Sequence, residues 1–184
     1  PDGTVFWSDC SGRLRRYDGE TGIVTAILGG TSVHDGEVAT NGFLCGPGGL
    51  SISADGKIYV ADVWSQRIRM IDPTTHIIHT VAGDGSRAYG GDNGKATEAY
   101  LGNPHDVSVD SHGRVVIADT RNGRIRIVEL DGIIRVVAGT TLPWDAGEGR
   151  WDKGDGGSAL SASIAHVESV THAENDDIYF GDCI

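Results

Sequence analysis

An eight-residue phrase recurs along this chain, and this repetition constrains the fold more than any single residue does. The phrase D-G-K-I-Y-V-A-D begins at Asp55 and H-G-R-V-V-I-A-D begins at His112, and each is followed by an R-I-R segment. Related phrases begin at Asp2 and Asp176. The register is marked by the aspartates that end each copy, Asp9, Asp62, Asp119 and Asp182. Self-similarity of this kind indicates stacked supersecondary units that bury a core between neighbours.

One complete unit is predicted to contain four strands. Residues 49–53 alternate small or polar with apolar side chains, and 58–62 are almost entirely apolar, as in a strand that is buried on both faces. Further strands are expected over 67–71 and 76–83, with turn signals between them. Strands lettered a to d in this order, joined by hairpins, make one propeller blade, so the fold class is an all-β propeller. The expected blades span about 1–45, 46–102, 103–166 and, as a partial blade, 167–184.

Composition agrees with a turn-rich β protein and argues against two kinds of partner. The chain has 184 residues with 28 glycines and 5 prolines. With 26 acidic and 15 basic side chains, its net charge of -11 repels nucleic acid and anionic membranes. The sequence also contains no apolar run long enough for a transmembrane helix. Three scattered cysteines form neither a disulfide framework nor a C-x-x-C metal site.

The connections between units repeat as well. Residues 84–104 contain a polar turn and then apolar residues at every third or fourth position, which predicts one helical turn between blades. The third connection carries an insertion that we expect to form an exposed binding loop. Its distinctive side chains are Trp144, Arg150 and Trp151.

These motifs resemble the NHL repeat. The resemblance includes G-P-G-G-L from Gly46, the two recurring phrases, and the connection G-D-N-G-K-A-T-E-A-Y-L from Gly91. It implies a ring, usually of six blades, whereas this chain supplies strands b to d of one blade, two whole blades, and strands a and b of another. We therefore expect a homodimer in which two copies complete a six-bladed ring. In that ring the first and last strands b would compete for one place at each junction.

The resemblance also indicates where a ligand would bind, because the starts of strands a converge at the mouth of a propeller channel. Aligned by the marker aspartates, these positions hold His105, Asp106, Glu168 and Ser169, which are the candidate ligand-binding residues. His105, Asp106 and Glu168 could hold a divalent cation such as Ca²⁺ or Zn²⁺. The resemblance extends to six-bladed lactonases and lyases with axial metal sites. The alternative is that these side chains line a wet channel and cap turns, with no cofactor.

The repeated arginines and marker aspartates have a structural interpretation. Each carboxylate at the end of strand b is expected to meet an arginine or a turn amide. The alternation in strand c predicts that these arginines point outward, next to abundant acids, so RNA binding is not expected.

Three functions follow as hypotheses. The first is a scaffold that binds a protein, peptide or small ligand through the connections and the axial mouth, without enzymatic activity. The second is a metal-dependent hydrolase or lyase with an axial site. The third is a half-ring whose main property is self-assembly. The sequence leaves the compartment open between export and the cytoplasm.

Overall fold

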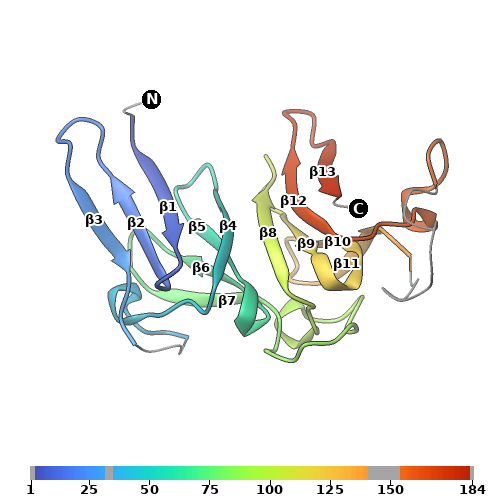
Figure 1. Cartoon of the computed structure of the whole chain (residues 1–184), viewed down its shortest axis with the longest axis horizontal. Helices are drawn as coiled ribbons and strands as arrows, with labels where there is room; N and C mark the ends of the chain where they lie inside the picture. The colour runs from blue at the N-terminus through green and yellow to red at the C-terminus, as the bar shows by residue number, and fades with distance from the viewer. Residues whose placement is uncertain (1–2, 32–34, 141–153, 183–184) are drawn as a thin grey trace.

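The strands of this chain form four antiparallel sheets arranged in sequence order. The computed structural model describes residues 3–31, 35–140 and 154–182. Two sheets have four strands, the first sheet has three, and the last has two. The three-stranded sheet and the two-stranded sheet lie at opposite ends of the array (Figure 1). The all-β propeller architecture is thus confirmed, with two whole blades between two partial ones.

Each sheet is built from consecutive strands. The first comprises β1 (Val5–Asp9), β2 (Arg13–Tyr17) and β3 (Val24–Leu28). The second comprises β4 (Pro47–Ile52), β5 (Ile58–Asp62), β6 (Arg67–Ile71) and β7 (Ile78–Ala82). The third comprises β8 (Pro104–Val109), β9 (Val115–Asp119), β10 (Arg124–Val128) and β11 (Ile134–Ala138), and the last β12 (Val167–His172) and β13 (Ile178–Asp182).

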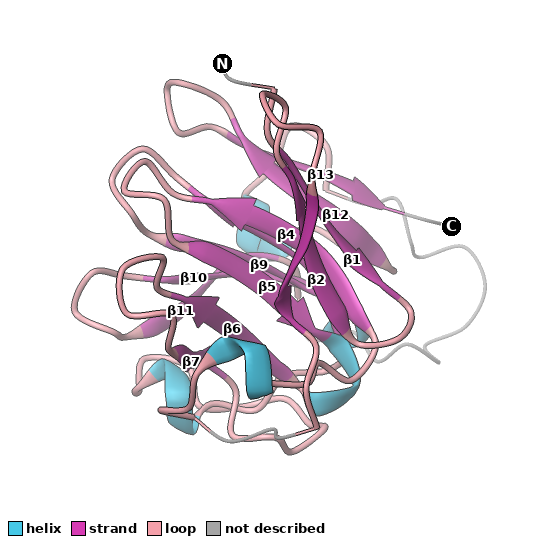
Figure 2. Ribbon diagram, turned by 90° about the vertical axis from the view of Figure 1, so that its left-hand side faces the viewer, coloured by secondary structure: helices cyan, strands magenta, loops and turns pink. Residues whose placement is uncertain are grey.

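Short 3-10 turns punctuate the connections, as the sequence predicted. Three lie between sheets, η1 (Ala39–Asn41), η3 (Ala96–Glu98) and η5 (Ala159–Ser161). Two more follow strands b, η2 (Val63–Ser65) and η4 (Thr120–Asn122). Figure 2 shows these turns beside the twisted sheets, which lie one behind another. No helix in the described part of the chain is long and apolar enough to cross a membrane.

Apolar side chains hold successive sheets together, with one cluster in each of the three spaces between them. The predicted double burial of strand b is confirmed in the two whole blades, where all of β9 and most of β5 are buried. In contrast, β13 is largely exposed. It has no strand c beside it among the described residues, so burial of strand b depends on the rest of its blade.

The three strands a of the described residues, β4, β8 and β12, set the geometry of the centre. Strand β8 packs against both β4 and β12. Side chains link these neighbours, since the Ser51 hydroxyl accepts a hydrogen bond from the Val109 amide at 3.1 Å. The Ser108 hydroxyl lies 2.8 Å from Nδ1 of His172 in the next sheet. Residues at the starts of β4, β8 and β12 therefore share one side of the array.

Two expectations from the sequence were wrong. The arginines of strand c do not all point outward, because Arg69 and Arg126 are 2% and 0% exposed. The connection from the preceding blade covers each guanidinium, placing Asp35 beside Arg69 and Asp92 beside Arg126. The sequence also predicted that strand d of the second blade begins at residue 76, whereas β7 begins at Ile78. His76 instead has a φ of 58° and lies in the turn before β7.

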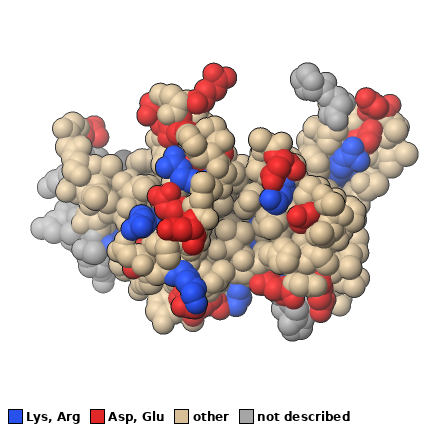
Figure 3. All heavy atoms as spheres, turned by 180° about the vertical axis from the view of Figure 1, so that it is seen from behind, with Lys and Arg blue, Asp and Glu red and all other residues tan. Residues whose placement is uncertain are grey.

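The marker aspartates of the two whole blades, Asp62 and Asp119, meet the partners that the sequence suggested, but in the interior. Asp119 is fully buried and accepts hydrogen bonds from the Gly102 amide and from Arg126. Burial raises the pKa of Asp119 to about 6, against the opposing effects of Arg126, Asn122 and the Gly102 amide. On the face shown in Figure 3, lysines and arginines lie among acidic side chains instead of forming one basic surface.

Candidate functional site at the axial mouth

The predicted ligand-binding residues lie at the starts of two neighbouring strands a. His105 and Asp106 belong to β8, and Glu168 and Ser169 belong to β12. The corresponding positions of β4 are Gly48 and Gly49, which contribute no side chains. The third and fourth blades therefore supply all the functional groups of this mouth within the described residues.

Asp106 ties these blades together. One carboxylate oxygen accepts a hydrogen bond from its neighbour, the Val107 amide, at 2.9 Å, and the other from the Val170 amide of β12 at 2.8 Å. The carboxylate also fills the space above Gly49, where a Cβ would lie 1.7 Å from Oδ1. Burial raises the pKa of Asp106, while the Val170 and Val107 amides oppose that shift. Both oxygens are thus engaged by backbone amides.

A pair of histidines and one glutamate form the more open part of the mouth. The rings of His105 and His166 lie edge to face with centroids 6.2 Å apart. Nδ1 of His166 lies 3.4 Å from Oε1 of Glu168. The backbone amide of His166 donates to the marker carboxylate of Asp182 at 2.7 Å, which fixes the start of β12. Two imidazoles and a carboxylate are ligands that suit Zn²⁺ or a polar organic ligand.

His166 was not among the residues predicted from the sequence. This residue precedes strand a by one position and corresponds to Gly46 and Asn103 in the other blades. Its signal was its spacing of two residues from Glu168, which places both side chains on one face of an extended segment. Ser169 is exposed, and its hydroxyl lies over Gly181 of β13. The three loop residues Trp144, Arg150 and Trp151 lie outside the described residues.

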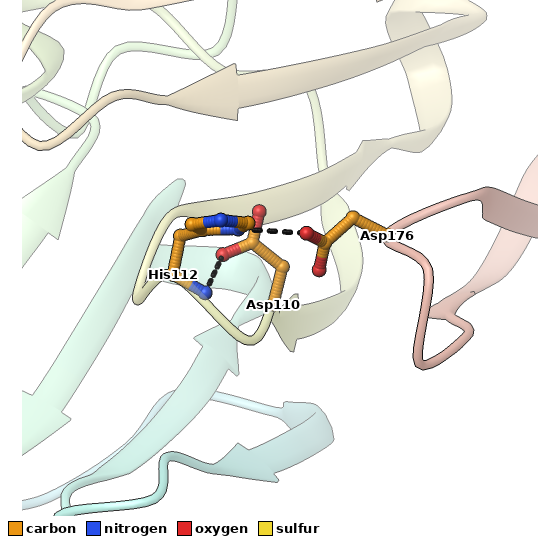
Figure 4. A group of neighbouring side chains, drawn as sticks. All are labelled: Asp110, His112 and Asp176. Atoms are coloured by element: carbon orange, nitrogen blue, oxygen red, sulfur yellow. Dashed lines mark hydrogen bonds and ion pairs between the residues drawn. The ribbon is translucent and has the colours of Figure 1, made fainter.

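A second group of polar side chains connects the a-to-b hairpins of the last two blades (Figure 4). Asp110, His112 and Asp176 place potential metal-binding atoms within 4.8 Å of one another. Nδ1 of His112 lies 2.7 Å from Oδ2 of Asp176. However, Nε of Arg114 already contacts Asp110 at 2.5 Å, so a cation here would compete with the guanidinium. The arrangement fits a contact between blades better than a metal centre.

Asp176 occupies a position that favours glycine. Its φ is 63°, and the equivalent residues of the preceding hairpins are Gly56 and Gly113, with φ of 82° and 89°. From this conformation its carboxylate accepts hydrogen bonds from both the amide and the hydroxyl of Ser111 on the neighbouring blade, at 3.2 Å each. Burial raises the pKa of Asp176, but the hydrogen bonds from Ser111 together with the nearby His112 and Arg114 lower it below its usual value.

Replacing Asp176 by glycine should therefore leave the chain more stable than replacing it by alanine, although both changes remove the same contacts. Alanine is strained at positive φ, whereas glycine is not. Thermal denaturation of both variants measures which of the two is more stable. The neighbouring Asp177 is the control, because it does not have positive φ and glycine should there be the worse substitution. The same order at both positions would contradict this account of the hairpin.

The sheets and their central strands define the class of protein as a β-propeller segment. Two stretches, residues 44–69 and 101–128, match the family model for the NHL repeat. These two stretches are NHL repeats, as the motifs suggested. Each match runs from the end of a connection through strands a, b and c, which are the strands that hold the marker aspartate and its arginine.

Similar proteins share these repeats over part of their length. The chain is 30% identical over 131 residues to Protein SUPPRESSOR OF QUENCHING 1, chloroplastic, of Arabidopsis thaliana, covering 66% of this chain and 12% of that protein. It is 32% identical over 88 residues to NHL repeat-containing protein 2 of Gallus gallus, covering 45% of this chain and 12% of that protein. The chain thus spans a small part of these relatives.

Solved structures show the same fold at low sequence identity. A protein of unknown function from Bacteroides thetaiotaomicron superposes with a TM-score of 0.73 at 20% identity, over 98% of this chain and 42% of that one. An auxiliary nutrient binding protein from the same organism superposes with a TM-score of 0.66 at 17% identity, over 98% of this chain and 43% of that one. Virginiamycin B lyase from Staphylococcus aureus superposes with a TM-score of 0.58 at 15% identity, over 98% of this chain and 46% of that one. This chain spans less than half of each of these structures.

Proposed function

We propose that this chain is a recognition scaffold that binds a protein, peptide or small polar ligand at the axial mouth and on the neighbouring connections. The observation that carries the proposal is the convergence of His105, His166 and Glu168 from two blades on one open surface. Glu168 and His166 have side chains that are 52% and 36% exposed, so they are available to a ligand. The auxiliary nutrient binding protein among the similar structures supports binding as a use of this fold.

A binding screen with two matched variants tests the scaffold function. Ligands from a panel of peptides, sugars and amino acids that raise the melting temperature of the chain would be titrated by calorimetry. His105→Ala and Glu168→Ala should each weaken binding by about tenfold, because each removes a polar contact at the mouth. Glu174→Ala is the control, since Glu174 is exposed in the β12–β13 hairpin, away from the mouth. Ligands that bind all three variants equally would place recognition elsewhere.

A metal-dependent hydrolase or lyase is the second candidate, favoured by the His166 imidazole beside Glu168 and by the His105 ring that lies edge to face with His166. His105, His166 and Glu168 would hold the cation, which would supply a Lewis acid at the mouth. Asp106 would position β8 and β12, because its oxygens already accept amide hydrogen bonds. Virginiamycin B lyase among the similar structures supports this alternative.

Metal titration separates the two candidates. An enzyme of this kind should bind Zn²⁺ or Ca²⁺ with a stoichiometry that falls when His105, His166 and Glu168 are replaced together by alanine. The recognition scaffold should show no such site-dependent uptake. Elemental analysis of the purified chain, before and after dialysis against a chelator, provides the measurement.

A further inference from the structure

A tyrosine of the second connection, between β7 and β8, packs against strand c of the third blade. The centroid of the Tyr89 ring lies 3.7 Å from Cζ of Arg124 and 5.6 Å from Cζ of Arg126. A guanidinium within about 6 Å of an aromatic face makes a favourable cation–π contact. Burial and a hydrogen bond to Asp92 raise the pKa of Tyr89. The ring is therefore held by two arginines of β10 and by a carboxylate of its own connection.

The backbone on either side of Tyr89 is bound by the same blade. The side-chain amide of Asn122 donates to the Ala88 carbonyl at 2.9 Å, and Arg126 donates to the Gly90 carbonyl at 3.0 Å. Residues 88–90 thus lie on the third blade as a bound peptide would, with the tyrosine in the middle.

The first connection, between β3 and β4, is too short to contain the same segment. Six residues, 29–34, separate the end of β3 from Asp35, whereas nine, 83–91, separate the end of β7 from Asp92. None of the six is a tyrosine. The second blade therefore receives no counterpart of Tyr89 from its own connection.

A hollow lies on the second blade where the third blade holds residues 88–90. Its volume of about 530 Å³ is within the range of small-molecule sites. In the third blade five residues contact the segment 88–90, namely Asp92, Tyr100, Asn122, Arg124 and Arg126. Their counterparts in the repeat all line the hollow, and these are Asp35, Phe43, Ser65, Arg67 and Arg69.

The two groups that hold the Tyr89 ring have accessible counterparts in this hollow. Arg67 is half-buried, whereas Arg124 beneath the ring is 4% exposed. The Arg67 guanidinium donates to two backbone carbonyls, which fix the orientation of its plane. The Asp35 side chain is 50% exposed, compared with 19% for Asp92. A flat cation and a carboxylate are thus in place on the second blade and open to a ligand.

We propose that this hollow binds a tyrosine side chain of a peptide, with the phenol ring over Arg67 and its hydroxyl donating to Asp35. Tyr89 makes the equivalent contacts with Arg124 and Asp92 in the third blade. Such binding rests on the recognition function proposed above, but it uses a place separate from the axial mouth. Neither histidine of that mouth, nor Glu168, is among the described residues that line the hollow.

NMR titration of the chain with three blocked amino acids tests the proposal. N-acetyltyrosine amide should shift the backbone signals of Asp35, Arg67 and Gly85, which line the hollow. It should bind about threefold more tightly than the phenylalanine analogue, which lacks the hydroxyl. It should bind about tenfold more tightly than the leucine analogue, which also lacks an aromatic face.

Variants of the two contact residues give the second measurement. Arg67→Ala should weaken tyrosine binding by about tenfold through the loss of the cation–π contact. Asp35→Asn should reduce the preference for tyrosine over phenylalanine, because a neutral amide oxygen is a weaker acceptor than a carboxylate. If the spectrum shows that Arg67→Ala disturbs the fold, Arg67→Lys takes its place and should weaken binding by about threefold, since an ammonium does not stack flat on a ring.

Two control variants lie away from the hollow. Arg121→Ala removes an exposed arginine of the third blade, and Glu168→Ala removes a carboxylate of the axial mouth. Both should bind N-acetyltyrosine amide as the original chain does. Equal binding of the three amino acids, or signal shifts confined to residues outside the hollow, would overturn the proposal.

The same controls separate this site from the function on which it rests. Tyrosine binding that is lost in Glu168→Ala but kept in Arg67→Ala would place the ligand at the axial mouth. The recognition function would then stand, and the tyrosine site of the second blade would be wrong. No binding of N-acetyltyrosine amide would also overturn this site, whereas the ligand panel described above tests the axial mouth independently.

Discussion

Replacing Arg126 by alanine should destabilise the chain by about 3–5 kcal/mol, the cost of leaving a buried charge without its partner. The Arg126 side chain is fully buried, and so is Asp119, whose Oδ2 lies 3.3 Å from its Nη1. Its guanidinium also donates to the carbonyls of Tyr100 and Gly90 at 2.7 and 3.0 Å and contacts Asp92. The substitution therefore leaves two carboxylates and two carbonyls without this donor, and it opens a cavity between blades.

Arg15→Ala provides the matched comparison, because Arg15 has the same place in the repeat but is 33% exposed. Its effect should be far smaller, as expected for an exposed ion pair. Urea denaturation of both variants measures this difference. Arg126→Lys should fall between the two, since an ammonium cannot reach all four acceptors in the geometry of a guanidinium. Equal costs for Arg126→Ala and Arg15→Ala would contradict the role assigned to the connection.

The strand pattern of this chain could be predicted because it depends on local sequence. Residues 58–62 are apolar throughout and form β5, and the following arginine-isoleucine alternation forms β6. The turn residues between them also follow from sequence, since Gln66 and Gly123 both end a 3-10 turn in the left-handed conformation. Repetition of the pattern then identified the partial blades at each end.

Burial of the strand-c arginines could not be predicted in the same way. The alternation of charged and apolar residues in β10 predicts which face of the sheet Arg126 lies on. It does not predict what covers that face. The cover comes from Asp92, 34 positions earlier in the sequence, through the connection from the preceding blade. Long-range placement of this kind also explains why Arg15, with the same local sequence, remains partly exposed.

The axial residues show a similar division. Alignment by marker aspartates placed His105 and Glu168 at equivalent positions, and both lie at the start of a strand a. It did not indicate that Asp106 would reach the Val170 amide on the next blade, because that bond depends on the spacing between β8 and β12. His166 was missed because its counterparts in the other blades are a glycine and an asparagine.

Replacing Gly49 by alanine should destabilise the chain by about 2–3 kcal/mol. A Cβ at this position would lie 1.7 Å from Oδ1 of Asp106, so the carboxylate would have to move. Movement would break its hydrogen bond to the Val170 amide, which at 2.8 Å joins the third blade to the fourth. Because Gly49 does not have positive φ, backbone strain does not contribute to this cost.

A double-mutant cycle isolates this cause. Asp106→Ala alone should cost about 1–3 kcal/mol through the loss of two amide hydrogen bonds. Adding Gly49→Ala to that variant should cost little more, because the obstructing carboxylate is gone, and the coupling energy should be about 1–2 kcal/mol. Additive costs in urea denaturation would show that Gly49 is required for another reason. Strong coupling would mean that Gly49 of the second blade admits the Asp106 side chain of the third, so that the mouth is shaped by unequal blades and not by a symmetric repeat.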